Sequence, residues 1–209
     1  MSHALTLMQW LSPAFPVGAF AYSHGLEQVI ADGVITNAGT LQDWLQALLE
    51  QGSGRTDAVL LAVAYRTDDL ALVDASARAF AAGAERLKET SLQGAAFCDT
   101  ARTVWGLEID SLTYPVAVGA AARAMQIPLH DTLPLYLHAF ASNLVSVAQR
   151  SMPLGQTDGQ RVLSALAPLI DTTAKATQTA TLDDLTSASF AADIAAMRHE
   201  TLQPRIFRT

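Results

Sequence analysis

The amino-acid sequence predicts an all-α protein that forms a single domain over residues 1–209. Half of the residues are hydrophobic and 16% are charged, so a chain of this length can bury a large core. Apolar residues recur at spacings of three and four, and alanine is abundant while runs of β-branched residues are short. Residues typical of helix ends separate these segments. About nine or ten helices are expected.

In the first half of the chain, capping residues mark the expected helices. Residues 22–30 carry apolar side chains on one helical face. Thr40 and Asp43 have the spacing of a capping box, and the glycines in residues 52–54 would end the helix that follows. The next two expected helices are residues 68–80, which Asp68 would cap, and residues 84–104, which follow Gly83.

Prolines and further caps divide the second half. Pro115 suits the first turn of a helix that reaches about Met125, and it argues against a strand over residues 112–118. Ile127-Pro128 would break the chain before a helix that Asp131 caps. Thr157 and Gln160 have the spacing of another capping box, and Pro168 is expected to kink or divide the helix that follows. Thr181 with Asp184 would begin one more helix.

The distribution of charge argues against nucleic acid as a partner. The formal net charge is -7, and the excess of acidic residues falls within residues 1–110. Binding to phosphates needs a basic surface, whereas the only lysines are Lys88 and Lys175. Acidic and apolar surfaces are better suited to protein partners.

The sequence favours a cytoplasmic protein without a membrane span. Residues 132–149 form a long uncharged stretch, but polar side chains such as His138 recur within it. A secretory signal requires a positively charged residue near its start, but the first Lys or Arg of the chain is Arg55. The single cysteine, Cys98, cannot form an internal disulfide and is compatible with a reducing compartment.

The sequence contains no recognisable site for catalysis, a cofactor or a metal. Nucleotide hydrolysis by the usual route needs a glycine-rich loop that ends in Lys and Ser or Thr, and neither lysine follows one. The five histidines are scattered, so tight metal binding is not expected; His24 and His199 are the first candidates for a weak contact. Ser23 is interpreted as a helix cap and Cys98 as a core residue. The chain is therefore not expected to be an enzyme.

Residues 12–27 form the most unusual stretch, with two prolines, two glycines and three aromatic residues before the first charged side chain. Two interpretations stay open: Phe15, Phe20 and Tyr22 belong to the core, with the glycines allowing tight turns, or they meet a partner. The pair Gln93-Gly94 falls inside an expected helix. Because glycine there costs about 1 kcal/mol relative to alanine, a close approach of another segment is expected.

Residues 201–209 are predicted to be a partner-binding tail. After Pro204 the chain reads Arg205-Ile206-Phe207-Arg208-Thr209, with two arginines flanking two large apolar residues. Covering each apolar side chain would contribute about 1.5 to 3 kcal/mol, and the arginines could meet carboxylates. The alternative is that the tail folds back onto its own domain.

Four stretches of the chain resemble the urease accessory protein family UreF. The opening stretch resembles the N-terminal signature of that family, and departures such as Ala19 and Ala21 change no charge. The other three stretches are Glu85–Phe97, with its Gln-Gly pair, Pro153–Gln160, with its Gly-Gln loop, and the end of the chain, with Arg198-His199-Glu200 and Arg205–Thr209.

The resemblance implies an all-helical, dimeric protein that joins UreD (UreH in some species) and the GTPase UreG on apo-urease, so that nickel reaches the active site. No catalytic residue and no cofactor are implied. Arg198–Thr209 is expected to contact UreD, and Ser12–Glu27 with Gln93-Gly94 to shape the surface for the dimer or UreG. The individual partner-binding candidates are Ser12, Pro13, Phe15, Pro16, Gly18, Tyr22, Ser23, His24, Gly25, Glu27, Gln93, Gly94, Arg198, His199, Glu200, Arg205, Ile206, Phe207 and Arg208.

Two alternatives stay open. The protein could activate GTP hydrolysis by UreG, which would require an arginine, such as Arg86 or Arg198, that reaches the phosphate site. It could also be a helical enzyme or ligand-binding domain unrelated to urease.

Overall fold

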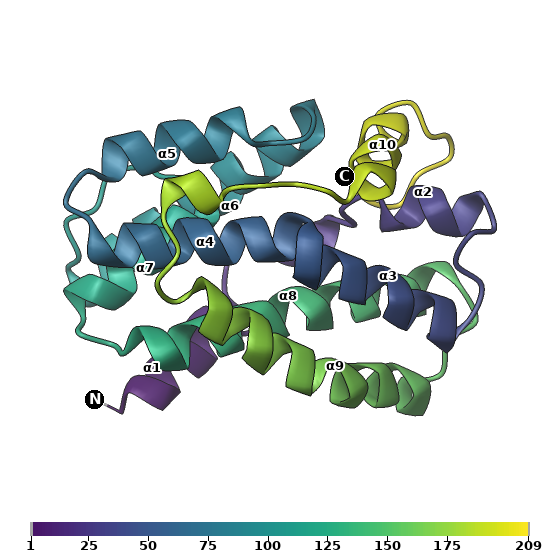
Figure 1. Cartoon of the computed structure of the whole chain (residues 1–209), viewed down its shortest axis with the longest axis horizontal. Helices are drawn as coiled ribbons and strands as arrows, with labels where there is room; N and C mark the ends of the chain where they lie inside the picture. The colour runs from purple at the N-terminus through teal and green to yellow at the C-terminus, as the bar shows by residue number, and fades with distance from the viewer. Residues whose placement is uncertain (1, 209) are drawn as a thin grey trace.

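The structure, a computed structural model, describes residues 2–208 and is built from helices (Figure 1). This part of the chain contains ten α-helices, two short 3-10 helices and no strand, which confirms the all-α prediction. The α-helices are α1 (His3–Trp10), α2 (Leu26–Ala31), α3 (Ala38–Gln51), α4 (Ser53–Arg66), α5 (Leu70–Ala79), α6 (Ala84–Trp105), α7 (Tyr114–Ala124), α8 (Leu129–Ser151), α9 (Gln156–Thr177) and α10 (Phe190–His199); the 3-10 helices are η1 (Ala19–Ala21) and η2 (Leu182–Asp184).

Helix α4 runs through the middle of the molecule, between α5 on one side and α9 on the other (Figure 1). Its residues from Thr56 to Ala62 are all buried, and it packs closely against α7. A Cβ atom at Gly119 of α7 would lie 2.4 Å from the Leu61 carbonyl oxygen, so only glycine allows this approach. Helix α8 packs against α4, α9 and α2, with Leu133, Leu137 and Leu144 fully buried. The core therefore lies between α4, α7 and α8.

Two of the expected helix starts in the first half are wrong by one to three residues. Helix α3 is capped by Asn37, whose Oδ1 accepts the Thr40 N–H at 3.1 Å while the Thr40 hydroxyl accepts the Asn37 N–H. Thr40 is thus the third residue of the helix and not its cap, because Asn37 offers an acceptor one turn earlier. Helix α5 is capped by Asp69, whose Oδ1 accepts the Leu72 N–H, whereas Asp68 pairs with Arg123.

The three residues 52–54, expected to end α3, provide only a single residue between two helices. Gly52 alone separates α3 from α4, which begins at Ser53. The glycines serve close packing instead, since a Cβ at Gly52 would lie 3.0 Å from the Leu48 Cα and a Cβ at Gly54 would lie 3.1 Å from the Leu48 carbonyl oxygen.

The later helices follow the sequence with three exceptions. Helix α8 begins at Leu129 after Pro128, so Asp131 lies in its first turn and is not its cap. Pro115 lies in the first turn of α7 and Thr181 forms a capping box with Asp184, as expected, although the second element is only the 3-10 helix η2. Helix α9 begins at Gln156 after Gly155 and has no hydrogen bond from a capping side chain. The predicted capping box of Thr157 and Gln160 is therefore wrong. Pro168 does not divide this helix.

Within residues 2–208, no helix is both long enough and apolar enough to cross a lipid bilayer. Cys98 is fully buried, as expected for a core residue.

Candidate functional site

The structure brings the opening stretch and the end of the chain together, although about 180 residues separate them in the sequence. Helix α10 packs on α2, and the C-terminus lies beside both (Figure 1). Gly25, which precedes α2 with φ +75°, faces the backbone of α10: a Cβ there would lie 2.6 Å from the Ala196 nitrogen. The glycine is therefore required by its backbone conformation and by this contact.

The opening stretch is partly core and partly surface. Phe15 and Tyr22 are buried, and Phe15 lies against Phe97 with ring centroids 5.5 Å apart. Phe20 is exposed, as are Pro13 and Pro16, while Ser12 is half-buried. Gly18 adopts φ +71°, the left-handed conformation that a tight turn requires. The core interpretation is thus confirmed for Phe15 and Tyr22, and Phe20 is left available to a partner.

Ser23, expected to be the helix cap, lies two residues before the N-cap position of α2. The N-cap residue of α2 is Gly25, and the Ser23 hydroxyl accepts a hydrogen bond from the Glu27 N–H at 3.5 Å. Ser23 is fully buried. Its hydroxyl therefore helps to satisfy the first turn of α2 from outside the helix.

The pair Gln93-Gly94 lies in the interior of α6. A Cβ at Gly94 would lie 1.9 Å from the Leu112 carbonyl oxygen and 2.7 Å from the Tyr114 nitrogen, so the segment before α7 crosses the helix here. This confirms the expected close approach. Both residues are buried, so they contribute to a partner surface only through the packing that they determine.

A cluster of charged and polar side chains from α4, α6, α8 and the opening stretch lies in the interior. Arg86 donates to both carboxylate oxygens of Asp57 at 2.7 Å, and its other terminal nitrogen lies 3.4 Å from Glu89. His24 Nε2 lies 2.9 Å from Glu89, and the Tyr136 hydroxyl donates to Asp57 at 3.0 Å. We call these five residues the central cluster.

The central cluster shifts the ionisation of its members. Burial opposes the charged form of Glu89, but the nearby His24 and Arg86 outweigh it and lower the pKa of this carboxyl. Burial, together with the negative charge of Asp57, raises the pKa of Tyr136 well above its ordinary value. Glu89 is therefore held as a carboxylate and Tyr136 as a neutral hydroxyl that can donate.

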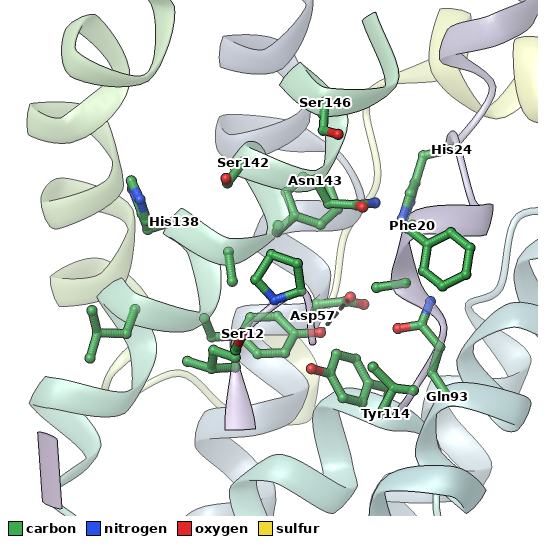
Figure 2. A pocket seen from close by; sticks show the side chains of 18 of the residues that line it. Ser12, Phe20, His24, Asp57, Gln93, Tyr114, His138, Ser142, Asn143 and Ser146 are labelled. Atoms are coloured by element: carbon green, nitrogen blue, oxygen red, sulfur yellow. Dashed lines mark hydrogen bonds between the residues drawn. The ribbon is translucent and has the colours of Figure 1, made fainter. Parts of the chain in front are cut away.

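A cavity of about 440 Å³ lies against the central cluster, and Figure 2 shows its lining. Its walls come from α1, the opening stretch and α8, with His24, Asp57 and Gln93 on its polar side and Phe20 among its apolar residues. The Tyr136 hydroxyl in its lining donates to Asp57, and residues 2–208 contain no group of three side chains placed to hold a metal ion. The cavity is thus large enough to receive a side chain or a small group.

A second buried cluster fixes the end of the chain. His199 is fully buried between Glu27 of α2 and Glu85 of α6, with Nε2–Oε2 and Nδ1–Oε2 distances of 2.8 and 2.9 Å. The Ile206 and Phe207 N–H groups donate to Glu27 at 2.7 and 3.0 Å. Arg205 donates to the other oxygen of Glu85 at 2.6 Å. We call Glu27, Glu85, His199 and Arg205 the C-terminal cluster.

The tail folds back onto its own domain, which was the alternative interpretation. Phe207 is buried beneath Arg150, whose guanidinium carbon lies 4.4 Å from the ring centroid, and the Arg208 N–H donates to the Ala21 carbonyl oxygen at 2.7 Å. Ile206 remains 70% exposed. Thr209 lies outside the described residues. A role for the tail in partner binding stays a prediction, which now depends on Ile206 and not on Phe207.

Helix α10 presents an apolar face to solvent. Phe190, Ile194 and Met197 follow a spacing of four and three, which places them on one side of the helix, and each is more than half exposed. Glu200, just beyond α10, accepts the Ala84 N–H at the start of α6. We call Phe190, Ile194, Met197 and Ile206 the C-terminal apolar face.

Comparison with known proteins identifies the family. A family model described as UreF matches residues 35–167, which is more than half of the chain. The chain belongs to the UreF family. The urease accessory protein UreF of Roseobacter denitrificans is 56% identical over 207 residues, which cover 98% of this chain and 93% of that protein. The proteins of the same name from Ruegeria sp. and Cereibacter sphaeroides are 57% and 53% identical over 208 and 210 residues, covering 98% and 100% of this chain and 97% and 100% of theirs.

In this UreF-family chain, the two histidines considered first for a metal lie in different clusters. His24 contacts Glu89 in the central cluster, and His199 contacts Glu27 and Glu85 in the C-terminal cluster. Both ring nitrogens of His199 are therefore occupied by protein contacts. This arrangement supports a structural role for His199.

Three features of the site could not be predicted from the sequence: the exposed stripe on α10 and the roles of Asp57 and Glu85. The spacing of Phe190, Ile194 and Met197 was readable as a helical stripe, but nothing in the sequence alone says that no other helix covers it. Asp57 and Glu85 carry no local signal, because their partners lie 29 and 114 residues away.

Proposed function

We propose that this UreF-family chain is a co-chaperone of nickel insertion, which joins UreD (or UreH) and the GTPase UreG on apo-urease. In this proposal the chain acts as a dimer in the cytoplasm and supplies no catalytic residue or cofactor. Membership of a family of urease accessory proteins supports a part in urease maturation. It also sets aside the idea of a helical enzyme unrelated to urease.

The C-terminal apolar face is the observation that carries the proposal. Large apolar side chains exposed on one side of a helix, such as Phe190, Ile194 and Met197, commonly mark protein–protein contacts, and such residues supply much of the binding energy when they are covered. We assign this face, together with Arg198–Thr209, to the contact with UreD. The opening stretch exposes Phe20 beside the cavity, and we assign this region to the dimer or to UreG.

Deleting Arg205–Thr209 is expected to abolish co-purification with UreD while leaving the helical circular-dichroism signal intact. Because the deletion also removes the buried Phe207, a second variant is needed. Ile206→Asp changes only an exposed side chain and should weaken the same complex at least tenfold. A complex that survives both changes would contradict the assignment of the tail.

Activation of UreG is the second candidate, and the structure favours Arg198 over Arg86 for it. Arg86 is held by Asp57 and Glu89 in the central cluster, whereas the Arg198 side chain is 60% exposed and pairs with Asp32 at the surface. An arginine that stabilises the transition state must reach the phosphates of the neighbouring protein. If this role holds, the intact protein accelerates GTP hydrolysis by UreG and Arg198→Ala loses most of the effect. An intact protein that gives no acceleration ends this alternative.

A further inference from the structure

The position of His199 requires a specific protonation state. Its ring is fully buried, and each ring nitrogen lies within 2.9 Å of a different carboxylate, Glu27 on one side and Glu85 on the other. An ionised carboxylate only accepts hydrogen bonds, and a neutral imidazole donates from only one nitrogen. Both contacts are hydrogen bonds only when both ring nitrogens carry a proton.

The other partners of the two carboxylates also indicate that both ring nitrogens of His199 carry a proton. Both oxygens of Glu27 accept N–H groups of the tail, from Ile206 and Phe207, and Glu85 accepts from Arg205. Each carboxylate is thus surrounded by donors, an arrangement that favours the charged form. The proton in each contact with His199 therefore comes from the ring.

The charges in this cluster balance only with a protonated ring. Glu27 and Glu85 supply two negative charges, and Arg205 and His199 supply two positive ones. The same elements also carry charged groups with other partners: Asp32 pairs with Arg198, Glu200 accepts the Ala84 N–H, and Arg86 and Glu89 of α6 belong to the central cluster. The others are Lys88, Asp99 and Arg102 of α6, Asp193 of α10 and Arg208 in the tail. If His199 lost one proton, the buried Glu27 and the half-buried Glu85 would share a single cation, and one histidine contact would become repulsive.

We propose that His199 is a proton-dependent clamp, which keeps residues 199–208 docked on α2 and α6 while both ring nitrogens are protonated and releases them when one proton is lost. His199 and Glu27 then act as positioning residues for the C-terminal apolar face. Glu27 accepts the backbone N–H of Ile206, which is a member of that face. The expectation that release of the tail weakens UreD binding rests on the proposed function. The clamp itself is a property of the isolated chain.

The clamp is tested on the full chain without a partner, by nuclear magnetic resonance over a series of pH values. Ring nitrogen shifts report the number of protons on His199, and amide protection factors of Ile206 and Phe207, corrected for the intrinsic pH dependence of exchange, report docking. We expect protection of these two amides to be lost at the pH where the ring loses its second proton. A singly protonated ring with fully protected amides would overturn the proposal, as would loss of protection at a pH unrelated to the His199 titration.

Substitution provides an independent test. His199→Gln removes the positive charge and should lower the protection of both amides at least tenfold, while Glu85→Gln in the same chain should restore part of it by removing the unbalanced charge. His130→Gln is the control, since this histidine is exposed and pairs only with Asp131. A His199→Gln chain that keeps full protection would overturn the clamp; if that variant does not fold, the titration of the unaltered chain still decides. Failure to bind UreD with an intact clamp would instead contradict the proposed function.

Discussion

Replacing Arg86 with methionine should destabilise the protein by about 3 to 5 kcal/mol, the range found when one partner of a buried ion pair is removed. Arg86 is the cation that both Asp57 and Glu89 contact, and its side chain is 14% exposed. The change leaves two buried carboxylates whose remaining partners include His24, Gln93 and Tyr136, none of which is an arginine or a lysine. Urea denaturation of both chains, followed by circular dichroism, measures the difference in free energy of unfolding.

The dependence on pH distinguishes lost charge from lost packing. In the unaltered chain, His24 and Arg86 outweigh burial and lower the pKa of Glu89. The contribution of Glu89 to stability is therefore fully present above the pKa that this carboxyl has in the unfolded chain, and it is lost as the pH falls through the lower pKa of the folded chain. Without Arg86, protonating the carboxylates relieves an unbalanced charge. The difference in stability between variant and parent should therefore shrink on acidification.

The matched control for this prediction is Arg161→Met. Arg161 pairs with Asp158 at 2.7 Å, the distance found between Arg86 and Asp57, but its side chain is 74% exposed. Exposed pairs contribute roughly 0 to 1 kcal/mol. Equal effects of the two substitutions would show that the central cluster contributes little through its charges.

Gly94→Ala should destabilise the fold by about 2 to 3 kcal/mol or prevent folding, despite the better helix propensity of alanine. The added Cβ would meet backbone atoms of Leu112, Thr113 and Tyr114 at 1.9 to 2.7 Å, and a backbone cannot move aside as a side chain can. Thermal unfolding followed by circular dichroism measures the loss.

Gly155→Ala is the control for the glycine prediction, because it has φ -68° and a Cβ there would meet only the Asp158 side chain at an ordinary 3.5 Å. Its effect should stay within about 0.5 kcal/mol. If Gly94→Ala is equally mild, the packing of α6 against the segment before α7 is looser than these distances indicate.

Local patterns predicted the helices well, because periodicity and caps act within a few residues. The long helix after Gly83 and the start of α7 at Pro115 follow directly from such signals. The errors arose where two local signals competed. Asn37 and Thr40 can both begin a helix, and the acceptor that comes first in the chain prevailed.

Most of the candidate site could not be predicted from the sequence, because it is formed by contacts between residues far apart in the chain. Gly94 signalled a close approach, but only the structure shows that the approaching segment is the one before α7. Glu27 belongs to the opening stretch and His199 to the end of α10, and their hydrogen bond joins positions 172 residues apart. The tail could not be placed for the same reason: its apolar residues were equally compatible with a partner and with its own domain, and the fold divides them between Phe207 inside and Ile206 outside.

The affinity of UreD for a chain with Ile194→Gln and Met197→Gln decides whether the C-terminal apolar face is the UreD contact. Both side chains are exposed on α10, so the changes leave the core untouched. Leu72→Gln on α5 is the control, because Leu72 and Ile194 have the same exposed fraction of 55%. Calorimetry or surface plasmon resonance should show at least a tenfold weaker complex, about 1.4 kcal/mol, for the α10 variant and no change for the control. Unchanged affinity for the α10 variant would contradict the assignment of this face to UreD.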